Sequence, residues 1–564
     1  MKISFKYEIK HNDKVTENEF IDILLKNRRV KDKEKFLNPP HPSQINLIDF
    51  GYRRELKKTL KLLEKIKRNS EMVVVYTDYD ADGITGGAIL WETLHKLGFK
   101  VMPYVPHRKL EGYGFSKKGI DAVKKQYNPS LIISVDHGIT AWEKVEYAKK
   151  LGIPVIITDH HLKPEKLPDQ AEAIFHIPEL SGSGVSYFFS KAIFEHFRSK
   201  NNPNYKLLIT NFQTDYLSLA SIGSVADLVP LLGATRSIVT YGLEAFDKCS
   251  RIGLNHIITE AGIRGRKITP YEIGFIIAPR INAVGRLEHA LDALRLLCTT
   301  SDRRARDLAG HIGIKNRERQ DLVIKAVDEA RNMVNNPEFA IGKKKLIILE
   351  SKGWHEGIIG LIASKICEEF YRPTIILTHS DGFMKGSARS IPGFHITNFL
   401  RSLKKYLIDV GGHTGAAGFT LEKNKYNNFS AAALKLSNKM IKDKDLERKI
   451  EVDVKIPLSK LNLSLAKKIE TLQPFGIGNA KPTFYSQVKI LELRSFGKKN
   501  EHLKMIVRDP KQKLFSFEFN KFYEDTVQNS SLKGRIIDVV YQLDINRWNG
   551  NENLRGKLQW YSQL

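Results

Sequence analysis

MVVVYTDYDADG, residues 72–83, is an apolar run that ends in three alternating carboxylates. Runs of this kind favour a buried β-strand, so the carboxylates are expected at the carboxyl end of a strand. The same pattern recurs where Asp136 follows residues 131–133 and where Asp159-His160-His161 follows residues 155–158. In an open parallel sheet, such strand ends meet in one crevice that binds ligands. Asp and His hold divalent cations, so the sequence predicts a two-metal phosphoesterase.

The acidic loop also resembles the start of a calcium-binding EF-hand loop. That interpretation fails because the last ligand position is Ile89, where a bidentate Glu is required, and because a strand precedes the loop. A single Asp here could instead cap a helix, but three carboxylates packed together repel one another unless cations neutralise them. Gly83, Gly86 and Gly87 would let the following helix begin close to a phosphate.

The two adjacent histidines cannot have identical roles, because neighbouring residues point in different directions. We assign His160 as a metal ligand, and we expect His161 to orient the substrate or to assist proton transfer. A single His in a loop is more often structural. The assignment therefore depends on the neighbouring Asp136 and on the acidic loop.

The net charge is +27 and the isoelectric point is near 9.6, which is more than solubility requires. This excess favours a polyanionic partner, most simply nucleic acid. A general abundance of Lys is the alternative explanation.

Three cysteines form no CxxC pair, so neither a zinc site nor a disulfide framework is indicated. With no signal peptide and no apolar run long enough to span a bilayer, we expect a cytoplasmic protein without membrane function.

The order of strand-like and helix-like segments predicts an α/β protein with several domains. Strand candidates at 72–76, 100–105, 131–135, 154–158 and 172–176 indicate a doubly wound parallel sheet. Short strands after residue 451, with a hairpin turn at Asn549-Gly550, indicate a small barrel of the oligonucleotide-binding (OB) kind. The expected parts are an N-terminal helical lead-in (1–70), a first α/β domain (71–300), a long connecting helix (301–340), a second α/β domain (341–450) and the barrel (451–564).

Eight short motifs together point to one family: TDYDADG (77–83), VDHG (135–138), TDHH (158–161), SVADLVP (224–230), PRINAVGR (279–286), NRERQ (316–320), WHEGIIG (354–360) and GGHTGAAG (411–418). In this combination the chain resembles the DHH phosphoesterase superfamily and, within it, the bacterial RecJ exonuclease family. The resemblance covers nearly everything from about residue 70 onward. It implies that the first α/β domain is a DHH catalytic domain and that the second is of the DHHA1 type.

The resemblance also implies a set of site residues. The metal ligands would be Asp80, Asp82, Asp136, His160 and Asp227, with two Mn²⁺ or Mg²⁺ ions as cofactors. Without the resemblance Asp227 would not be selected as a site residue, because Asp-Leu-Val-Pro is typical of an ordinary loop. Catalytic roles fall to His161, Asp136 and Asp78. Residues expected to bind substrate phosphates are Arg108, Arg280, Asn282, Arg286, Ser387, Arg389 and His413.

The barrel offers candidates for holding a single strand, because aromatic faces beside basic side chains suit unpaired nucleic acid. These candidates are Phe496, Lys498, Lys499, Lys504 and Trp548, with His502 beside them. Phe515, Phe517 and Phe519 alternate on one face, and we expect them to belong to the barrel core instead.

The function implied by the resemblance is a 5′→3′ exonuclease that is specific for single-stranded DNA, releases 5′-mononucleotides and acts in recombination and repair. A helicase and a single-strand-binding protein would be its partners. Two alternatives remain. A DHH phosphodiesterase for short oligonucleotides or cyclic dinucleotides would not need the barrel, and an inactive DNA-binding scaffold would not need clustered carboxylates. A pyrophosphatase would need neither the barrel nor the large positive charge.

Overall fold

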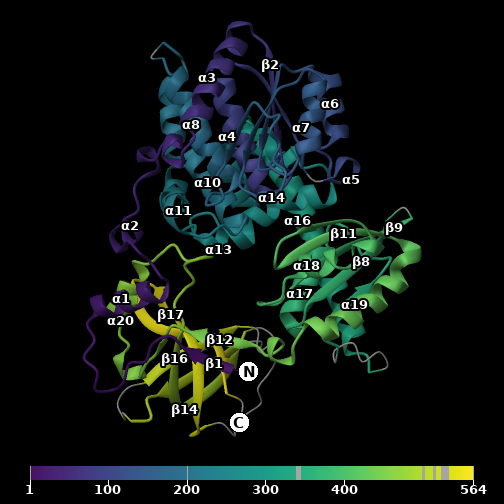
Figure 1. Cartoon of the computed structure of the whole chain (residues 1–564). Coiled ribbons are helices and arrows are strands. Elements are labelled where there is room, and N and C mark those ends of the chain that lie inside the picture. Colours follow the sequence, from purple (N-terminus) through teal and green to yellow (C-terminus); the bar gives the residue numbers. More distant parts are fainter. Residues whose placement is uncertain are drawn as a thin grey trace. The chain divides into compact units, whose positions relative to one another are not determined.

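The computed structural model describes residues 2–112, 114–199, 201–337, 344–380, 382–497, 502–511, 516–522 and 533–562 (Figure 1). The chain divides into two compact units. The smaller unit contains residues 280–292 and 306–449, and the larger unit contains residues 3–279, 293–305 and 450–564. Within the described ranges, every helix is too short or too polar to cross a membrane.

A five-stranded parallel sheet with the order β3-β2-β4-β5-β6 lies in the larger unit. Nearly every residue of β2, β4 and β5 is buried, as is usual for a parallel sheet that helices cover on both faces. This confirms the doubly wound α/β fold expected from the sequence. The strands are β2 (Met72–Thr77), β3 (Lys100–Tyr104), β4 (Leu131–Val135), β5 (Val155–Asp159) and β6 (Ala173–His176).

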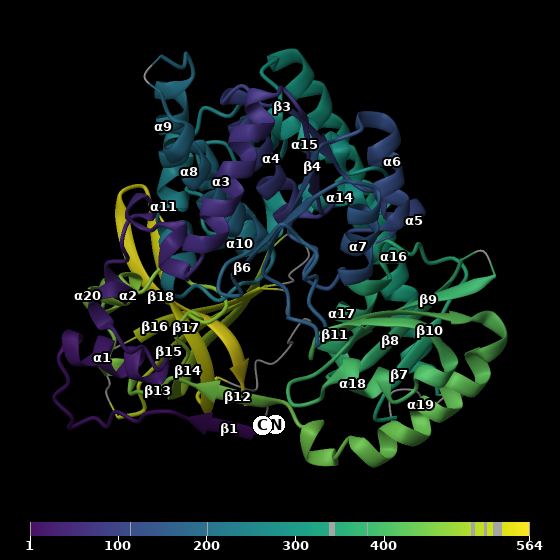
Figure 2. The same ribbon diagram turned by 45° about the horizontal axis from the view of Figure 1, so that its top comes forward.

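Helices α6 (Lys117–Tyr127) and α7 (Trp142–Lys150) cover one face of this sheet, where Ile120 and Val145 pack against Val74. Helices α4 (Ala81–Lys96) and α8 (Gly182–Phe197) pack against each other and against β2 and β5 (Figure 2). The other helices of this part are α3 (Arg53–Arg68), α5 (Arg108–Glu111), α9 (Tyr205–Gln213), α10 (Asp215–Ala226), α11 (Gly233–Ala245), α12 (Ile252–Glu260), α13 (Pro270–Glu272), the π-helix η4 (Ile273–Ile277) and α15 (Leu291–Cys298).

Helix α10 is buried against α4, α8 and α11 because its side chains are small. Ser218, Ser221 and Ser224 are buried, and the hydroxyls of Ser221 and Ser224 donate to backbone carbonyls of the same helix at 2.8 Å. Gly242 of α11 lies so close that a Cβ there would be 2.5 Å from the Cβ of Ser221. This tight packing fixes the carboxyl end of α10, where Asp227 lies.

The smaller unit contains a second sheet in the order β10-β11-β9-β8-β7, in which only β7 and β8 are parallel. The three antiparallel strands extend this sheet beyond the parallel pair. The strands are β7 (Ile347–Glu350), β8 (Thr374–Ser380), β9 (Phe383–Arg389), β10 (Leu407–Gly412) and β11 (Ala416–Glu422). The helices are α14 (Ala278–Leu287), the expected long helix α16 (Asp302–Asn335), α17 (Ile359–Phe370), α18 (Ile396–Arg401) and α19 (Tyr426–Met440).

The C-terminal part forms a closed β-barrel, because β14 pairs with both β15 and β17. The expected OB-like barrel is therefore confirmed. Asn549 and Gly550 both have positive φ, 49° and 78°, as the tight hairpin between β17 and β18 requires. The elements are β12 (Lys449–Val452), β13 (Val454–Lys455), α20 (Leu463–Glu470), β14 (Phe484–Phe496), β15 (His502–Arg508), β16 (Ser516–Phe522), β17 (Ile536–Trp548) and β18 (Asn551–Tyr561).

The N-terminal segment packs on this barrel, in addition to leading to the first parallel strand. Ile9, Phe20 and Leu24 are buried in the same hydrophobic core as Phe484 of β14. The sequence contains no signal for this packing, because the residues that meet lie more than 400 positions apart in the chain. The side chain of Asn27 also donates a hydrogen bond to the carbonyl of Asp453. The segment consists of β1 (Lys2–Phe5), α1 (Glu17–Asn27) and α2 (Lys33–Leu37).

A buried guanidinium joins the parallel-sheet domain to the barrel within the larger unit. Arg236 of α11 is 1% exposed and donates to the carbonyl oxygens of Phe36, Leu472 and Gln473 at 2.6, 3.2 and 2.7 Å. It also lies 3.9 Å from the centroid of the Phe36 ring. Burial lowers the pKa of Arg236 to about 10, so it stays charged at neutral pH and satisfies these buried carbonyls.

Replacing Arg236 with Met should lower the free energy of unfolding by about 3 kcal/mol, because several buried carbonyls lose a charged donor. The measurement is the melting temperature in a thermal scan. Arg54→Met removes an exposed guanidinium from α3 and serves as the matched control with little expected change. Equal melting temperatures for Arg236→Met and the wild type would contradict this role.

Candidate metal centre

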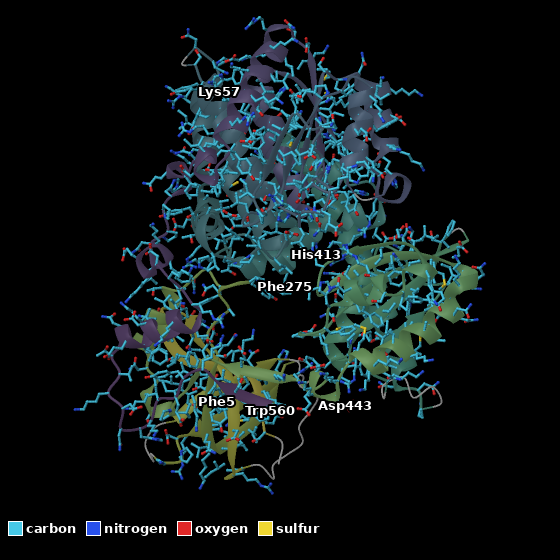
Figure 3. All side chains as sticks on the ribbon, in the orientation of Figure 1. Phe5, Lys57, Phe275, His413, Asp443 and Trp560 are labelled. Carbon is cyan, nitrogen blue, oxygen red and sulfur yellow. The ribbon has the colours of Figure 1, made fainter. Side chains whose placement is uncertain are left out.

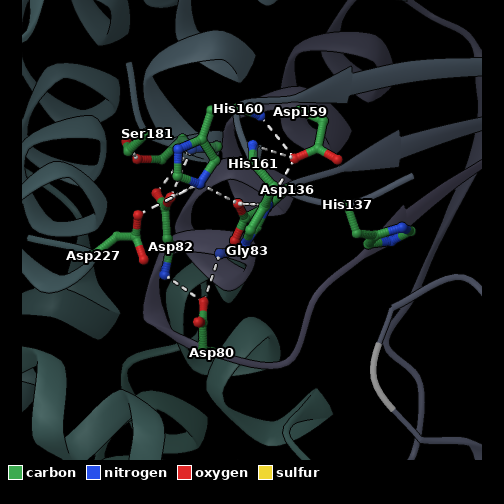
Figure 4. Close-up of polar contacts among 12 residues, drawn as sticks. Asp80, Asp82, Gly83, Asp136, His137, Asp159, His160, His161, Ser181 and Asp227 are labelled. Atoms are coloured by element: carbon green, nitrogen blue, oxygen red, sulfur yellow. Dashed lines mark hydrogen bonds and ion pairs between the residues drawn. The ribbon is translucent and has the colours of Figure 1, made fainter. Parts of the chain in front are cut away.

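The loop between β2 and α4 brings its acidic residues to the start of a helix (Figure 4). Asp80 is the N-cap of α4, and its Oδ1 accepts hydrogen bonds from the backbone N–H groups of Asp82 and Gly83 at 3.0 and 3.1 Å. A Cβ at position 83 would lie 2.7 Å from the Cβ of Asp78, so the turn requires glycine. The positive end of the helix dipole favours negative charge at this place.

The carboxylate of Asp82 is held by the beginning of a second helix, α8. Its Oδ2 accepts from the N–H of Gly182 at 2.6 Å, and its Oδ1 accepts from the N–H of Ser183 at 2.8 Å. A Cβ at Gly182 would lie 2.4 Å from the Cβ of Asp136, and one at Gly223 would lie 2.2 Å from Oδ1 of Asp82. The two glycines therefore allow the backbone to approach both carboxylates.

Asp136 follows β4 in a left-handed conformation with φ 66°, which is uncommon for a residue other than glycine. Nε2 of His160 lies 3.1 Å from Oδ1 of Asp136 and 3.4 Å from Oδ2 of Asp227. Among the described residues, neither Oδ1 of Asp136 nor Nε2 of His160 has a hydrogen-bond partner, and both atoms are buried. Such atoms are rare in folded proteins, and a cation between them would satisfy both.

Asp159 lies behind the two histidines and fixes their positions. Its Oδ1 accepts from Nδ1 of His161 at 2.8 Å and from the backbone N–H of His160 at 2.7 Å, and its Oδ2 accepts from the N–H of Ile139 at 2.8 Å. Burial opposes protonation of His161, but the hydrogen bond and charge of Asp159 raise the pKa of His161 to about 9. The two imidazole rings are tilted by 54° to each other.

Crowding of negative charge raises the pKa of several carboxyl groups in the centre. Burial and the nearby Asp82 and Asp80 raise the pKa of Asp227 to about 8. Burial and Asp82 likewise raise the pKa of Asp136, and burial and Asp80 raise that of Asp78. The carboxylates of the centre therefore carry more negative charge than the positively charged side chains around them neutralise. An excess of this kind favours the binding of a cation.

The side chains fit divalent cations in number and in chemistry. Carboxylate oxygen with some imidazole nitrogen is a donor set that Mn²⁺ and Mg²⁺ accept. Three groups each place one ligand atom per residue within 4.8 Å of one another: Asp136, His160 and His161; Asp82, His160 and Asp227; and Asp78, Asp80 and Asp136. Every metal-binding and catalytic residue expected from the sequence thus lies in one cluster.

Arg108 of α5 lies at the edge of this cluster. Its guanidinium is 5.2 Å from the centroid of the Tyr79 ring, within the acidic loop. The positive charge of Arg108 lowers the pKa of Asp78, but burial outweighs that effect. A guanidinium beside a cation site is placed to contact a phosphate.

Two of the expected phosphate-binding residues lie together in the smaller unit. Arg389 and Ser387 are on β9, and Nη1 of Arg389 donates to Oγ of Ser387 at 3.1 Å. Gly360, in the first turn of α17, lies beside them, since a Cβ there would lie 3.0 Å from Nη2 of Arg389 and 3.2 Å from Oγ of Ser387. A helix N-terminus beside a guanidinium suits an anion. His413 follows β10, and its N–H donates to the Ala416 carbonyl at 2.7 Å.

The remaining expected phosphate contacts lie on α14. Nη1 of Arg286 donates to the carbonyl of Gly357 at 3.1 Å, which joins two of the sequence motifs within the smaller unit. Burial, and to a lesser extent the charge of Arg280, lower the pKa of Arg319. Asn282 lies between Arg280 and Arg286 on the same helix.

The barrel residues expected to hold DNA are less completely described. The Phe496 ring packs edge-on against His502, with centroids 5.0 Å apart, and Lys504 pairs with Glu518 at 2.7 Å. Lys498 and Lys499 lie outside the described residues, as does the side chain of Trp548. A role for this group in DNA binding stays a prediction.

Sequence reasoning missed the residues that hold the ligands in place. Asp159 belongs to a motif without a role of its own being expected for it, and no role is expected for Gly182 or Ser183. The signal available for the latter was Ser181-Gly182-Ser183-Gly184 ahead of an apolar run, which is a sequence typical of a helix start. Ser181 is indeed the N-cap of α8, and its Oγ accepts from the N–H of Gly184 at 3.1 Å.

Three segments of the chain match known domains: the N-terminal domain of the DHH family (residues 72–223), the DHHA1 domain (343–439) and the RecJ OB domain (452–559). A DHH domain whose strand ends gather carboxylates and imidazoles defines a DHH-type phosphoesterase. The chain is 30% identical to "Single-stranded-DNA-specific exonuclease RecJ" of Escherichia coli, over 89% of each chain. The chain therefore belongs to the RecJ family.

Other relatives agree with this result. The RecJ protein of Bacillus subtilis is 34% identical over 91% of this chain, which spans 66% of that relative's length. The crystal structure of RecJ from Thermus thermophilus in complex with Mn²⁺ aligns with a TM-score of 0.80 at 26% identity, covering all of this chain and 80% of the other.

Cation binding should be visible as stabilisation. Adding Mn²⁺ to EDTA-treated protein should raise the melting temperature, by the equivalent of about 2.7 kcal/mol at one hundred times the dissociation constant. Asp227→Asn should lose at least half of this increase. The metal-free variant should also melt higher than the metal-free wild type at pH 8, because a carboxyl group with a raised pKa destabilises the folded state as pH rises above its unfolded value.

Asp169→Asn, at an exposed carboxylate of the same domain, is the control and should keep the full response to Mn²⁺. A wild-type protein that Mn²⁺ does not stabilise, or an Asp227→Asn variant that responds like the wild type, would exclude Asp227 as a ligand.

Proposed function

We propose that this chain is a metal-dependent exonuclease specific for single-stranded DNA, which degrades strands from 5′ to 3′ and releases 5′-mononucleotides. The observation that carries the proposal is the buried cluster of carboxylates and imidazoles at the ends of β2, β4 and β5, in a chain of the RecJ family. Relatives named single-stranded-DNA-specific exonucleases match along nearly the whole chain, and solved relatives contain Mn²⁺ or Mg²⁺.

In this proposal Asp80, Asp82, Asp136, His160 and Asp227 hold two divalent cations, with Asp78 beside them. Bound there, the cations would polarise the phosphodiester and activate water for attack on phosphorus. The geometry of the protein keeps the ligands in place before substrate arrives, because the helix N-termini and Asp159 fix the loops that carry them.

His161 is suited to act on the substrate rather than to hold the structure together. Its Nδ1 is occupied by Asp159, which keeps the ring protonated at neutral pH in the metal-free protein. A protonated imidazole so oriented can donate a hydrogen bond to the phosphodiester or a proton to the departing 3′-oxygen. Arg108 would contribute a second positive charge next to the same phosphate.

The direction of degradation requires that the enzyme recognise a 5′ end. Arg389 and Ser387, with the first turn of α17, are the proposed pocket for a terminal phosphate. Arg280, Asn282, Arg286 and His413 are the proposed contacts to further phosphates. The barrel, with Phe496 and Lys504, would hold the single strand away from the site of cleavage.

The cellular setting follows by analogy with the family. We place the protein in the cytoplasm, in DNA recombination and repair, where a helicase would supply single strands and a single-strand-binding protein would be the other partner. The net charge of +27 supports a polyanionic substrate.

The first test is digestion of single-stranded DNA labelled separately at each end, with Mn²⁺, Mg²⁺ or EDTA. We expect metal-dependent release of the 5′ label as a mononucleotide, with duplex DNA spared. Asp80→Asn keeps an N-cap for α4 but removes a charge, so cleavage should fall about a thousandfold while binding changes little. Cleavage of only very short oligonucleotides, or tight binding without any cleavage, would overturn the proposal.

A second test concerns the 5′ end. The wild type should cleave a 5′-phosphorylated strand faster than a 5′-hydroxyl strand, and Arg389→Ala should reduce this preference about tenfold. Arg401→Ala removes an exposed guanidinium from α18 and is the matched control. An Arg389→Ala enzyme with the wild-type preference would place the end-recognising pocket elsewhere.

A further inference from the structure

Two aromatic side chains project into solvent from the larger unit and stack on each other. Tyr271 is 60% exposed and Phe275 is 71% exposed. Their ring centroids are 5.0 Å apart with an interplanar angle of 28°. Figure 3 shows Phe275 at the margin of its domain. Exposed apolar side chains that lie together mark interaction sites more often than single ones do.

The backbone holds this pair in place from both sides. A capping box at Thr269 and Glu272 starts the helix, with the Thr269 N–H donating to Glu272 at 3.0 Å. Ile273 and Ile277 are buried and anchor the opposite face. Phe275 itself lies in a π-helix, a rare conformation that often accompanies functional sites. The pair is therefore a fixed feature of the surface rather than a frayed end.

The π-helix that carries Phe275 packs on the helix that ends at Asp227. A Cβ at Gly274 would lie 3.8 Å from Cγ1 of Val225. Val225 is two residues before Asp227, a proposed metal ligand at the end of α10. The exposed rings thus lie on a segment that packs against the helix ending at Asp227.

Positive charge precedes the pair in the sequence. Arg264, Arg266 and Lys267 are exposed and shortly precede Tyr271 in the same unit. Exposed aromatic faces near cationic side chains in the chain suit a single-stranded nucleic acid, whose bases stack while its phosphates pair with the cations. An apolar protein surface would gain nothing from these charges.

We propose that Tyr271 and Phe275 form a stacking platform for a base of the single strand near the position of cleavage. This inference rests on the proposed function, since it assigns a contact for the same substrate. Stacking does not depend on base identity, so the platform would hold any sequence in place without selecting one.

The test compares strand binding by the full-length protein in EDTA, where no cleavage occurs. The probes are a fluorescent single strand with a 5′-phosphate and identical strands that carry one abasic site at successive positions. For the wild type, one abasic position near the 5′ end should weaken binding about tenfold. The double variant Tyr271→Ala/Phe275→Ala should bind the intact strand about tenfold more weakly and should not distinguish that abasic strand.

Two controls separate stacking from general damage. Tyr271→Phe/Phe275→Tyr keeps both rings and should keep wild-type binding and the abasic effect. Leu207→Ala removes a 45% exposed side chain from α9 and should change neither measurement. Unchanged melting temperatures would establish that the variants are folded.

The outcomes also separate this inference from the proposed function. If the wild type fails to release 5′-mononucleotides, the proposed function is wrong. If the wild type does so but the alanine double variant binds intact and abasic strands as the wild type does, the platform alone is wrong. Unchanged strand binding with an altered oligomeric state would instead assign the pair to contact with a second copy of the chain.

Discussion

Repulsion between buried carboxylates is the constraint on which the larger unit depends. Asp78, Asp82 and Asp136 are each no more than 2% exposed, and their mutual repulsion must be offset by cations, by protons or by local dipoles. The fold opposes this repulsion with backbone dipoles, since the N-termini of α4 and α8 both point at the acidic groups. Glycines at the contact points let these helix ends come close enough. The remaining negative charge is what gives the site its affinity for divalent cations.

The two histidines divide their tasks through a residue that does not itself reach the cluster. Asp159 accepts hydrogen bonds from both backbone N–H groups of His160 and His161, and it also binds the His161 ring. His160 keeps its Nε2 turned toward Asp136 and Asp227. Burial lowers the pKa of His160, while the hydrogen bond and charge of Asp159 raise that of His161, so the two adjacent imidazoles differ in their readiness to bind a proton.

Local patterns explain how much of this could be predicted from the sequence. An apolar run followed by carboxylates predicts a strand and the edge at which it ends, so the parallel sheet and the meeting of Asp80, Asp136 and His160 were expected. The support of Asp82 by Gly182 was not, because that contact spans 100 residues and depends on helix packing. The same holds for the N-terminal segment on the barrel. Phe517 and Phe519 were assigned to the barrel core from their alternation, and they are 5% and 0% exposed.

The chain as a whole is positively charged, whereas the metal centre is rich in carboxylates. This difference affects how a DNA strand is bound. A net charge of +27 attracts DNA over a distance, but a phosphate that enters the centre meets a cluster of carboxylates. Cations must bind before a phosphate is accepted there, so binding of metal and of the scissile group should be coupled. A base stacked on Tyr271 and Phe275 carries no net charge and is not repelled by the carboxylates. An uncharged contact can therefore retain the strand while the phosphate and the cations are exchanged.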